Sequence, residues 1–243
     1  MAAPGETNVK DEEMDHVLKK AAQDPQDLDP LLLKRIGDAI KPTLRPVRPL
    51  APVWLMSMSL VVVCAGVSLV GAARAGFYGI AKMNLLERSV IFPALGLLVC
   101  LAAVSFVHQM IPASRIRVSP SALPALSSAA LLAVFGLLFR DYHTDHFFSV
   151  GIVCLLTGLL HAIPAGLLSW LMLRRGFAVD SASAGLVAGT LGGLAGVGLL
   201  ELHCPNFQAV HILVWHAAVI PVNAALGALL GWELRFRPRS DNR

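Results

Sequence analysis

Six long runs of apolar residues, separated by short polar segments, dominate the pattern of the chain after residue 52. Each run holds about 20 residues, the length that an α-helix needs to cross a hydrocarbon core about 30 Å thick. The pattern therefore predicts an all-α polytopic membrane protein, with a six-helix transmembrane bundle behind a short N-terminal segment. The expected spans are residues 53–73, 90–110, 121–139, 148–173, 183–200 and 211–234.

The composition agrees with this pattern. Apolar residues make up 56% of the chain and charged residues only 15%, whereas soluble domains have about 45–50% and about 25%. The net charge of +4 comes from arginines at the ends of the apolar runs. Direct binding of nucleic acid is therefore not expected.

Lysine and arginine flank the apolar runs unevenly, and in membrane proteins the cytoplasmic flanks carry the excess. The rich side holds Lys34, Arg35, Lys41, Arg45, Arg48, Arg115, Arg117, Arg174, Arg175, Arg235, Arg237, Arg239 and Arg243. The poor side holds Arg74, Lys82, Arg88 and Arg140. Both termini are therefore expected in the cytoplasm, with three short outer segments at residues 74–89, 140–147 and 201–210.

Residues 1–52 form the expected cytoplasmic tail, followed by a membrane domain of residues 53–234 and a basic C-terminus of residues 235–243. The tail has two predicted helices: residues 11–22, and a second helix that begins near Asp29 and Pro30, an N-cap and a first-turn proline. The apolar stripe of the second helix consists of Leu31, Leu32, Leu33, Ile36 and Ile40, and a proline-rich lead with Arg45 and Arg48 follows it. So small a stripe cannot bury itself, so it is expected either to bind a partner or to lie on the membrane surface.

The fifth span is rich in glycine. Small residues four positions apart let helix backbones approach closely in lipid, so this span is expected to pack tightly at the centre of the bundle. The glycines with this spacing are Gly185, Gly189, Gly192, Gly193 and Gly196, and Gly227 and Gly231 repeat the pattern in the sixth span.

Side chains that can bind metals or react with oxidants gather at the outer ends of the last three spans. Ionisable groups near a bilayer are costly, so a cluster of them is a functional-site hypothesis. Cys154 lies near the outer boundary of the fourth span and would approach Cys204 if the fourth and fifth spans pack together. The cluster consists of Cys154, Glu201, His203, Cys204, His211 and His216.

Three interpretations of this cluster are open. The two cysteines could form a disulfide or respond as thiols to an oxidant, or the side chains could only hydrogen-bond between helices. A soft or borderline metal ion could instead bind, and its candidate ligands are Cys154, Cys204, His203 and His211. His211 and His216 would lie about 140° apart on an α-helix, so one site using both from this helix alone is not expected.

Three stretches of the chain resemble the NrsF-type integral membrane anti-sigma factors, negative regulators of an extracytoplasmic-function sigma factor in bacteria. The stretches are residues 44–50, which read LRPVRPL; Cys154 with Arg174, Arg175 and Gly176 after it; and Glu201 to His216, with His203, Cys204, Pro205, His211 and Trp215. The likeness runs from about residue 31 to 236, and its last stretch is the most specific.

The resemblance implies six spans in the bacterial inner membrane, a cytoplasmic N-terminal segment that holds the sigma factor at the membrane, and a cysteine pair associated with sensing. Cys154 and Cys204 fall at the positions of that pair. The chain departs from the family in its longer tail before Leu31 and in two outer histidines, His143 and His146.

The predicted function is that of a regulator in a stress response, not an enzyme. The tail stripe, with Arg45 and Arg48, is expected to sequester an extracytoplasmic-function sigma factor. An oxidant or heavy metal sensed in the periplasm at the outer cluster would release it. No cofactor is expected apart from a candidate metal ion at this cluster, and the oligomeric state is open. The alternative is a membrane redox or metal- or haem-binding enzyme that uses Glu201, His203, His211 and His216.

Overall fold

The computed structural model describes residues 30–40, 51–111, 118–175 and 180–236. Over these residues the chain is helical, and the only β pairing among them is an isolated bridge between Asp141 and Gln208. The predicted all-α fold is therefore confirmed. The chain divides into two compact units, Met1–Pro49 and Leu50–Arg243.

The described part of the first unit is the helix α2, Pro30–Ile40. It coincides with the second helix predicted in the tail, where Asp29 and Pro30 were expected to begin it. Leu31, at the start of its apolar stripe, is exposed. The other predicted tail helix, residues 11–22, and the lead with Arg45 and Arg48 lie outside the described residues.

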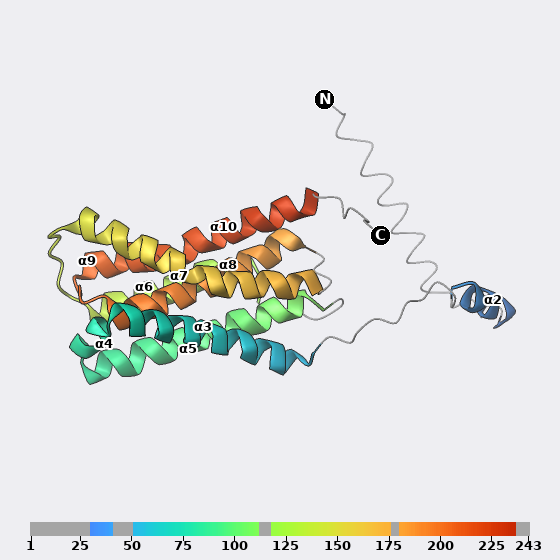
Figure 1. Ribbon diagram of the computed structural model, residues 1–243, viewed down its shortest axis with the longest axis horizontal. Coiled ribbons are helices and arrows are strands. Elements are labelled where there is room, and N and C mark those ends of the chain that lie inside the picture. The colour runs from blue at the N-terminus through green and yellow to red at the C-terminus, as the bar shows by residue number, and fades with distance from the viewer. Residues whose placement is uncertain (1–29, 41–50, 112–117, 176–179, 237–243) are drawn as a thin grey trace, which may run out of the picture. The chain divides into compact units, whose positions relative to one another are not determined.

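Five helices of the second unit are long and apolar enough to cross a membrane, and they lie side by side in one bundle (Figure 1). They are α3 (Val53–Ala75), α5 (Leu85–Gln109), α7 (Phe147–Arg175), α8 (Ser181–His203) and a composite span that runs from α9 (Ala209–His211) through a π-helical turn (Ile212–His216) to α10 (Ala217–Phe236). The third predicted span forms the shorter apolar helix α6, Ala122–Leu138, of 17 residues. Five of the six predicted spans therefore meet the length requirement.

Two helices begin earlier than their apolar runs, because polar residues cap them. At the start of α5, Asn84 accepts a hydrogen bond from the backbone of Glu87, whose side chain accepts one from the backbone of Asn84. This reciprocal pair satisfies two backbone donors and starts the helix at Leu85 instead of residue 90. Asp180 caps α8 in a similar way through the backbone of Ala182 and Ser183.

The glycine-rich helix α8 lies at the centre of the bundle, as its sequence predicts. The most apolar stretch of α8 is 78% buried, whereas the corresponding stretches of the other four long helices are 28–50% buried. A Cβ atom on Gly193 would lie 2.8 Å from the Cα atom of Ile220, and one on Gly185 would overlap the backbone of Gly227. The glycines therefore let α8 and α10 pack backbone against backbone.

Candidate functional site

The two predicted sensor cysteines lie in contact at one end of the bundle. Cys154 stands in the second turn of α7 and Cys204 directly follows α8. Their Sγ atoms are 3.5 Å apart, and both are free thiols with little exposure, 9% and 3%. A disulfide would need the sulfurs at about 2.05 Å, so the pair consists of two neighbouring thiols.

A π-helical turn brings His211 and His216 together. In this turn the backbone N–H of Ala217 donates to the carbonyl of Ile212, five residues earlier. A π-helix therefore places residues five apart on the same side, and the two imidazole centroids lie 5.2 Å apart. No site using both histidines from this span alone was expected, because an α-helix would place them about 140° apart. The π-helical turn removes that separation.

These four residues form one buried group. Cys154, Cys204, His211 and His216 each offer one ligand atom, and these atoms all lie within 4.8 Å of one another. The Nε2 atom of His211 is 3.6 Å from Cys204 Sγ, and the two imidazoles are 0% and 1% exposed. Thiols and imidazoles are the side chains that borderline metal ions prefer.

His203 does not join this group, although it was among the predicted metal ligands. Its Nδ1 atom lies 3.0 Å from the carbonyl oxygen of Gly76, and its ring packs against Tyr78. Gly76 has a φ of 101°, a conformation that favours glycine, and it ends α3 there. Helix α8 continues to His203, so Glu201 and His203 lie about 200° apart around it and face different neighbours.

Glu201 faces the buried group through His216. Its Oε1 atom lies 2.7 Å from Nδ1 of His216, and both side chains are almost completely buried. Because a carboxylate only accepts hydrogen bonds, this contact favours a proton on Nδ1, and in the neutral imidazole Nε2 then keeps a free lone pair. Among the described residues, neither that Nε2 atom nor Nδ1 of His211 has a hydrogen-bond partner.

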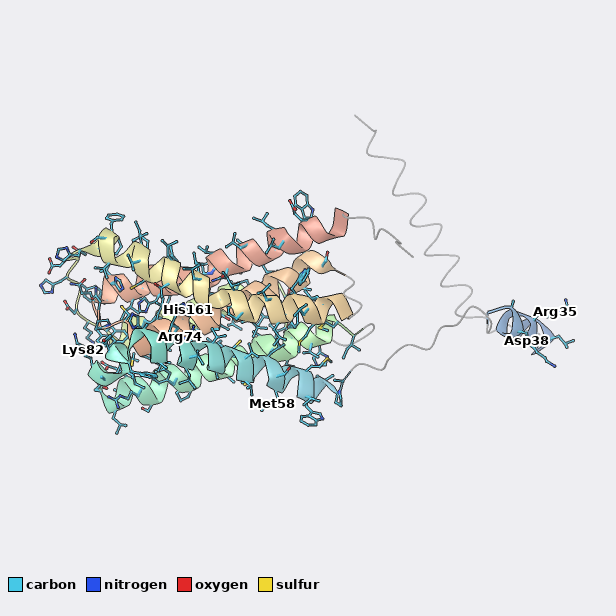
Figure 2. The ribbon with its side chains drawn as sticks, viewed as in Figure 1. Arg35, Asp38, Met58, Arg74, Lys82 and His161 are labelled. Atoms are coloured by element: carbon cyan, nitrogen blue, oxygen red, sulfur yellow. The ribbon has the colours of Figure 1, made fainter. Side chains whose placement is uncertain are left out.

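Short segments between the helices close this end of the bundle over the group. The helix α4 (Tyr78–Lys82), which was expected to be part of a loop, lies against the end of α8. A Cβ atom on its Gly79 would lie within 2.8 Å of the carbonyl oxygens of both Glu201 and Cys204. Lys82 donates a hydrogen bond from Nζ to the Pro205 carbonyl and stands at this end of the bundle (Figure 2).

The loop before α7 adds a second part of this cover. The ring of Phe139 stacks on that of Phe207 at 5.4 Å, and the backbone N–H of Ala209 donates to the carbonyl of Asp141. In the same loop His143 forms an exposed ion pair with Asp141. The hydrogen bond between these side chains raises the pKa of His143 and lowers that of Asp141. His143 and His146 are exposed and do not join the buried group.

Two other features near the group were not singled out from the sequence. A Cβ atom on Gly151 would overlap the Trp215 ring, which packs against Phe147 and Phe148. Gly79 allows α4 to touch the end of α8. Single glycines beside apolar residues are a signal for such close approaches, but the sequence does not say which segment approaches.

The fold and this site define an α-helical membrane protein with a buried thiol–imidazole group beneath short loops. The sequence model described as NrsF, negative regulator of sigma F, matches residues 42–236. This match covers more than half of the chain, which therefore belongs to the NrsF family. Neither a curated protein nor a solved structure matches the chain.

The family description makes the chain a negative regulator of a sigma factor, with a sigma factor as its partner. The match includes both cysteines and the whole stretch Glu201 to His216. It begins at residue 42, whereas the resemblance led us to expect a start near residue 31. The helix α2 therefore precedes the matched region, and the family match assigns it no role.

Proposed function

We propose that this protein is a membrane-bound anti-sigma factor that sequesters an extracytoplasmic-function sigma factor through its N-terminal cytoplasmic segment. It releases the sigma factor when an oxidant or a heavy metal reaches Cys154 and Cys204 from the periplasm. The observation that carries the proposal is the contact between these two thiols within the region that matches the family of negative regulators.

The proposed location is the bacterial inner membrane, with both termini in the cytoplasm. The excess of lysine and arginine on one set of flanks supports this orientation. Helix α6 is the sixth crossing, because its 17 residues reach the lower limit of about 17 for a transmembrane helix. With this topology the thiol–imidazole group and its cover face the periplasm.

The sigma factor binds to the tail, residues 1–52, before the membrane domain of residues 53–234 and the basic C-terminus of residues 235–243. Helix α2 supplies the contact, with an exposed Leu31 at its start. Amphipathic helices bind partners by placing an apolar face in a groove. The contact residues are Leu31, Leu32, Leu33, Ile36 and Ile40, and Arg45 and Arg48 extend it toward the membrane.

The signal acts on the sulfur pair. A two-electron oxidant accepts two electrons while the two thiols lose two protons and form one S–S bond. The sulfurs must then move about 1.5 Å closer, which shifts the start of α7 against the end of α8. A soft metal ion produces a related shift when it replaces the thiol protons and binds both sulfurs.

This shift regulates the tail only if the two packing states differ in their affinity for the sigma factor. Helix α8 is suited to transmit it, because it is the most buried helix and touches α10 backbone to backbone. Glu201, His211 and His216 belong to the sensing end around the sulfurs, and His203 joins the end of α8 to Gly76 beside it.

The test is co-purification of a sigma factor with the full-length chain in detergent, with one extracytoplasmic-function sigma factor co-expressed at a time. Leu32→Asp with Ile36→Asp should abolish co-purification, because both positions belong to the apolar stripe. Lys34→Asp, which places the same side chain about 200° from both Leu32 and Ile36 around α2, should retain it. Equal binding by all three chains would show that α2 is not the contact.

A further inference from the structure

We infer that Cys154, Cys204, His211 and His216 are the four ligands of a resident metal ion of the zinc class, and that Glu201 orients His216 toward it. This inference rests on the proposed function and deepens it, because it names the chemistry of the sensing site. It replaces His203 with His216 in the ligand set expected from the sequence.

Two distances within the group are close to those of a tetrahedral site. Bonds of about 2.3 Å to sulfur and about 2.0 Å to nitrogen place two sulfurs about 3.8 Å apart and a sulfur and a nitrogen about 3.5 Å apart. The two Sγ atoms are 3.5 Å apart, and Cys204 Sγ is 3.6 Å from His211 Nε2. The widest separation among the four ligand atoms, at most 4.8 Å, needs to close by at most about 1.5 Å.

The charges also fit a divalent ion. When it binds, the two cysteines lose their thiol protons, and their two thiolate charges neutralise the ion. Burial of a neutral centre of this kind costs far less than burial of isolated thiolates. Two sulfurs and two imidazole nitrogens in tetrahedral positions are typical of zinc, whereas magnesium and calcium require oxygen ligands.

The unpartnered nitrogen of His216 is the second, independent observation. Its ring is 1% exposed, and among the described residues its Nε2 atom has no hydrogen-bond partner. On the other side of the ring, Glu201 accepts the Nδ1–H hydrogen bond at 2.7 Å. Metal-binding histidines typically donate their second ring N–H to a carboxylate, which fixes the ring and strengthens the ligand. In the neutral ring the Nε2 lone pair is therefore available to a metal ion.

The ligands come from three separate parts of the fold. Cys154 belongs to α7, Cys204 follows α8, and the π-helical turn presents His211 and His216 together. A metal ion would therefore join the outer ends of α7, α8 and the last span. A two-electron oxidant that converts the two thiolates to a disulfide would release the ion. The S–S bond would then join α7 to the end of α8, and the last span would lose its link to both, which gives the sensing end two distinct states.

The experiment uses the full-length chain, purified in detergent under reducing conditions from cells grown with zinc. Elemental mass spectrometry should find about one zinc ion per chain. His211→Gln, His216→Gln and Cys204→Ser should each lose most of this zinc, whereas the neighbouring control His203→Gln should keep it. Glu201→Gln should lower the zinc affinity by about 10- to 100-fold without abolishing binding.

A second measurement does not depend on any variant folding. Cobalt exchanged into the wild-type chain should show intense visible bands of a tetrahedral ion and a thiolate-to-cobalt charge-transfer band. Weak octahedral bands without the charge-transfer band would overturn the inference. So would wild-type protein with reduced thiols and no bound metal, or zinc lost in His203→Gln but kept in His216→Gln.

The outcomes also separate this inference from the proposed function. A chain that binds and releases its sigma factor through the cysteine pair, yet contains no metal, would refute the metal centre and leave the regulator intact. A chain that holds zinc at these four ligands but binds no sigma factor would refute the proposed regulator and leave the metal centre intact.

Discussion

Gly79→Ala tests whether α4 is the cover that keeps water and reagents from the cysteine pair. The new methyl group would lie 2.8 Å or less from the carbonyl oxygens of both Glu201 and Cys204. These are backbone atoms that cannot rotate away, so α4 has to move from the end of α8. Overpacking of this kind costs about 1–3 kcal/mol.

This cost applies to the closed state and not to a state in which α4 has lifted. Since each 1.4 kcal/mol is a factor of ten, the population of the open state should rise by about 5- to 150-fold. The rate at which a membrane-impermeant maleimide labels Cys204 should rise by the same factor. Peptide mass spectrometry on the purified chain measures this rate at each cysteine separately.

Gly96→Ala is the matched control, because a Cβ atom on this exposed glycine of α5 would meet nothing within 4 Å. It should leave the labelling rate of Cys204 unchanged. Equal rates in Gly79→Ala and Gly96→Ala would refute the reasoning and show that reagents reach the cysteines by another path.

Two further predictions concern hydrogen bonds elsewhere in the bundle and its loops. Ser68 donates to the carbonyl of Ala195 at 2.8 Å, and interhelical hydrogen bonds in membranes contribute about 0.6 kcal/mol on average. Ser68→Ala should therefore lower the Tm in detergent slightly. Ser59→Ala, which loses only a hydrogen bond within its own helix, should lower the Tm less. The reverse order would contradict the stabilising role of the bond between Ser68 and Ala195. The ion pair of Asp141 and His143 raises the pKa of His143 above 6.5 and lowers that of Asp141 below 3.8. The stabilisation from His143 is complete below the pKa of His143 in the unfolded chain, and it is lost as the pH rises through the pKa of His143 in the folded chain. The stabilisation from Asp141 is complete above the pKa of Asp141 in the unfolded chain, and it is lost as the pH falls through the pKa of Asp141 in the folded chain. Hydrogen-exchange protection of this loop should therefore be greatest between about pH 4 and 6.5. Asp141→Asn should lower the pKa of His143 in an NMR titration. An unchanged pKa of His143 would show that the ion pair does not form in solution.

Most of the fold was predictable because lipid simplifies the problem. An apolar run long enough to cross the bilayer has to be helical, since no water satisfies its backbone groups. The glycines of α8 identified the central helix for a similar reason, because only small residues let backbones touch. The capping signal in the sequence at Asp29 and Pro30 predicted a helix that begins there, and α2 begins at Pro30. Such a signal is local and does not depend on the rest of the chain.

The candidate site was predictable only in part. Cys154 and Cys204 could be matched by depth in the membrane, and their contact required only that α7 and α8 pack together. The partnership of His211 with His216 depends on one π-helical turn, and no periodicity of side chains reveals such a turn. Pro221, which cannot donate a hydrogen bond to the carbonyl four residues earlier, is the nearest sign that this span is irregular. His203 was misplaced because its direction depends on how far α8 continues.

The most direct test of the regulator is the fate of the sigma factor when the cysteine pair is oxidised. Membranes that contain the full-length chain and its bound extracytoplasmic-function sigma factor are treated with a two-electron thiol oxidant, and the released sigma factor is measured. The account predicts release from the wild type and retention by Cys154→Ser with Cys204→Ser, which should bind the sigma factor equally well before treatment. Equal release from both chains, or no sigma factor on either membrane, would contradict it.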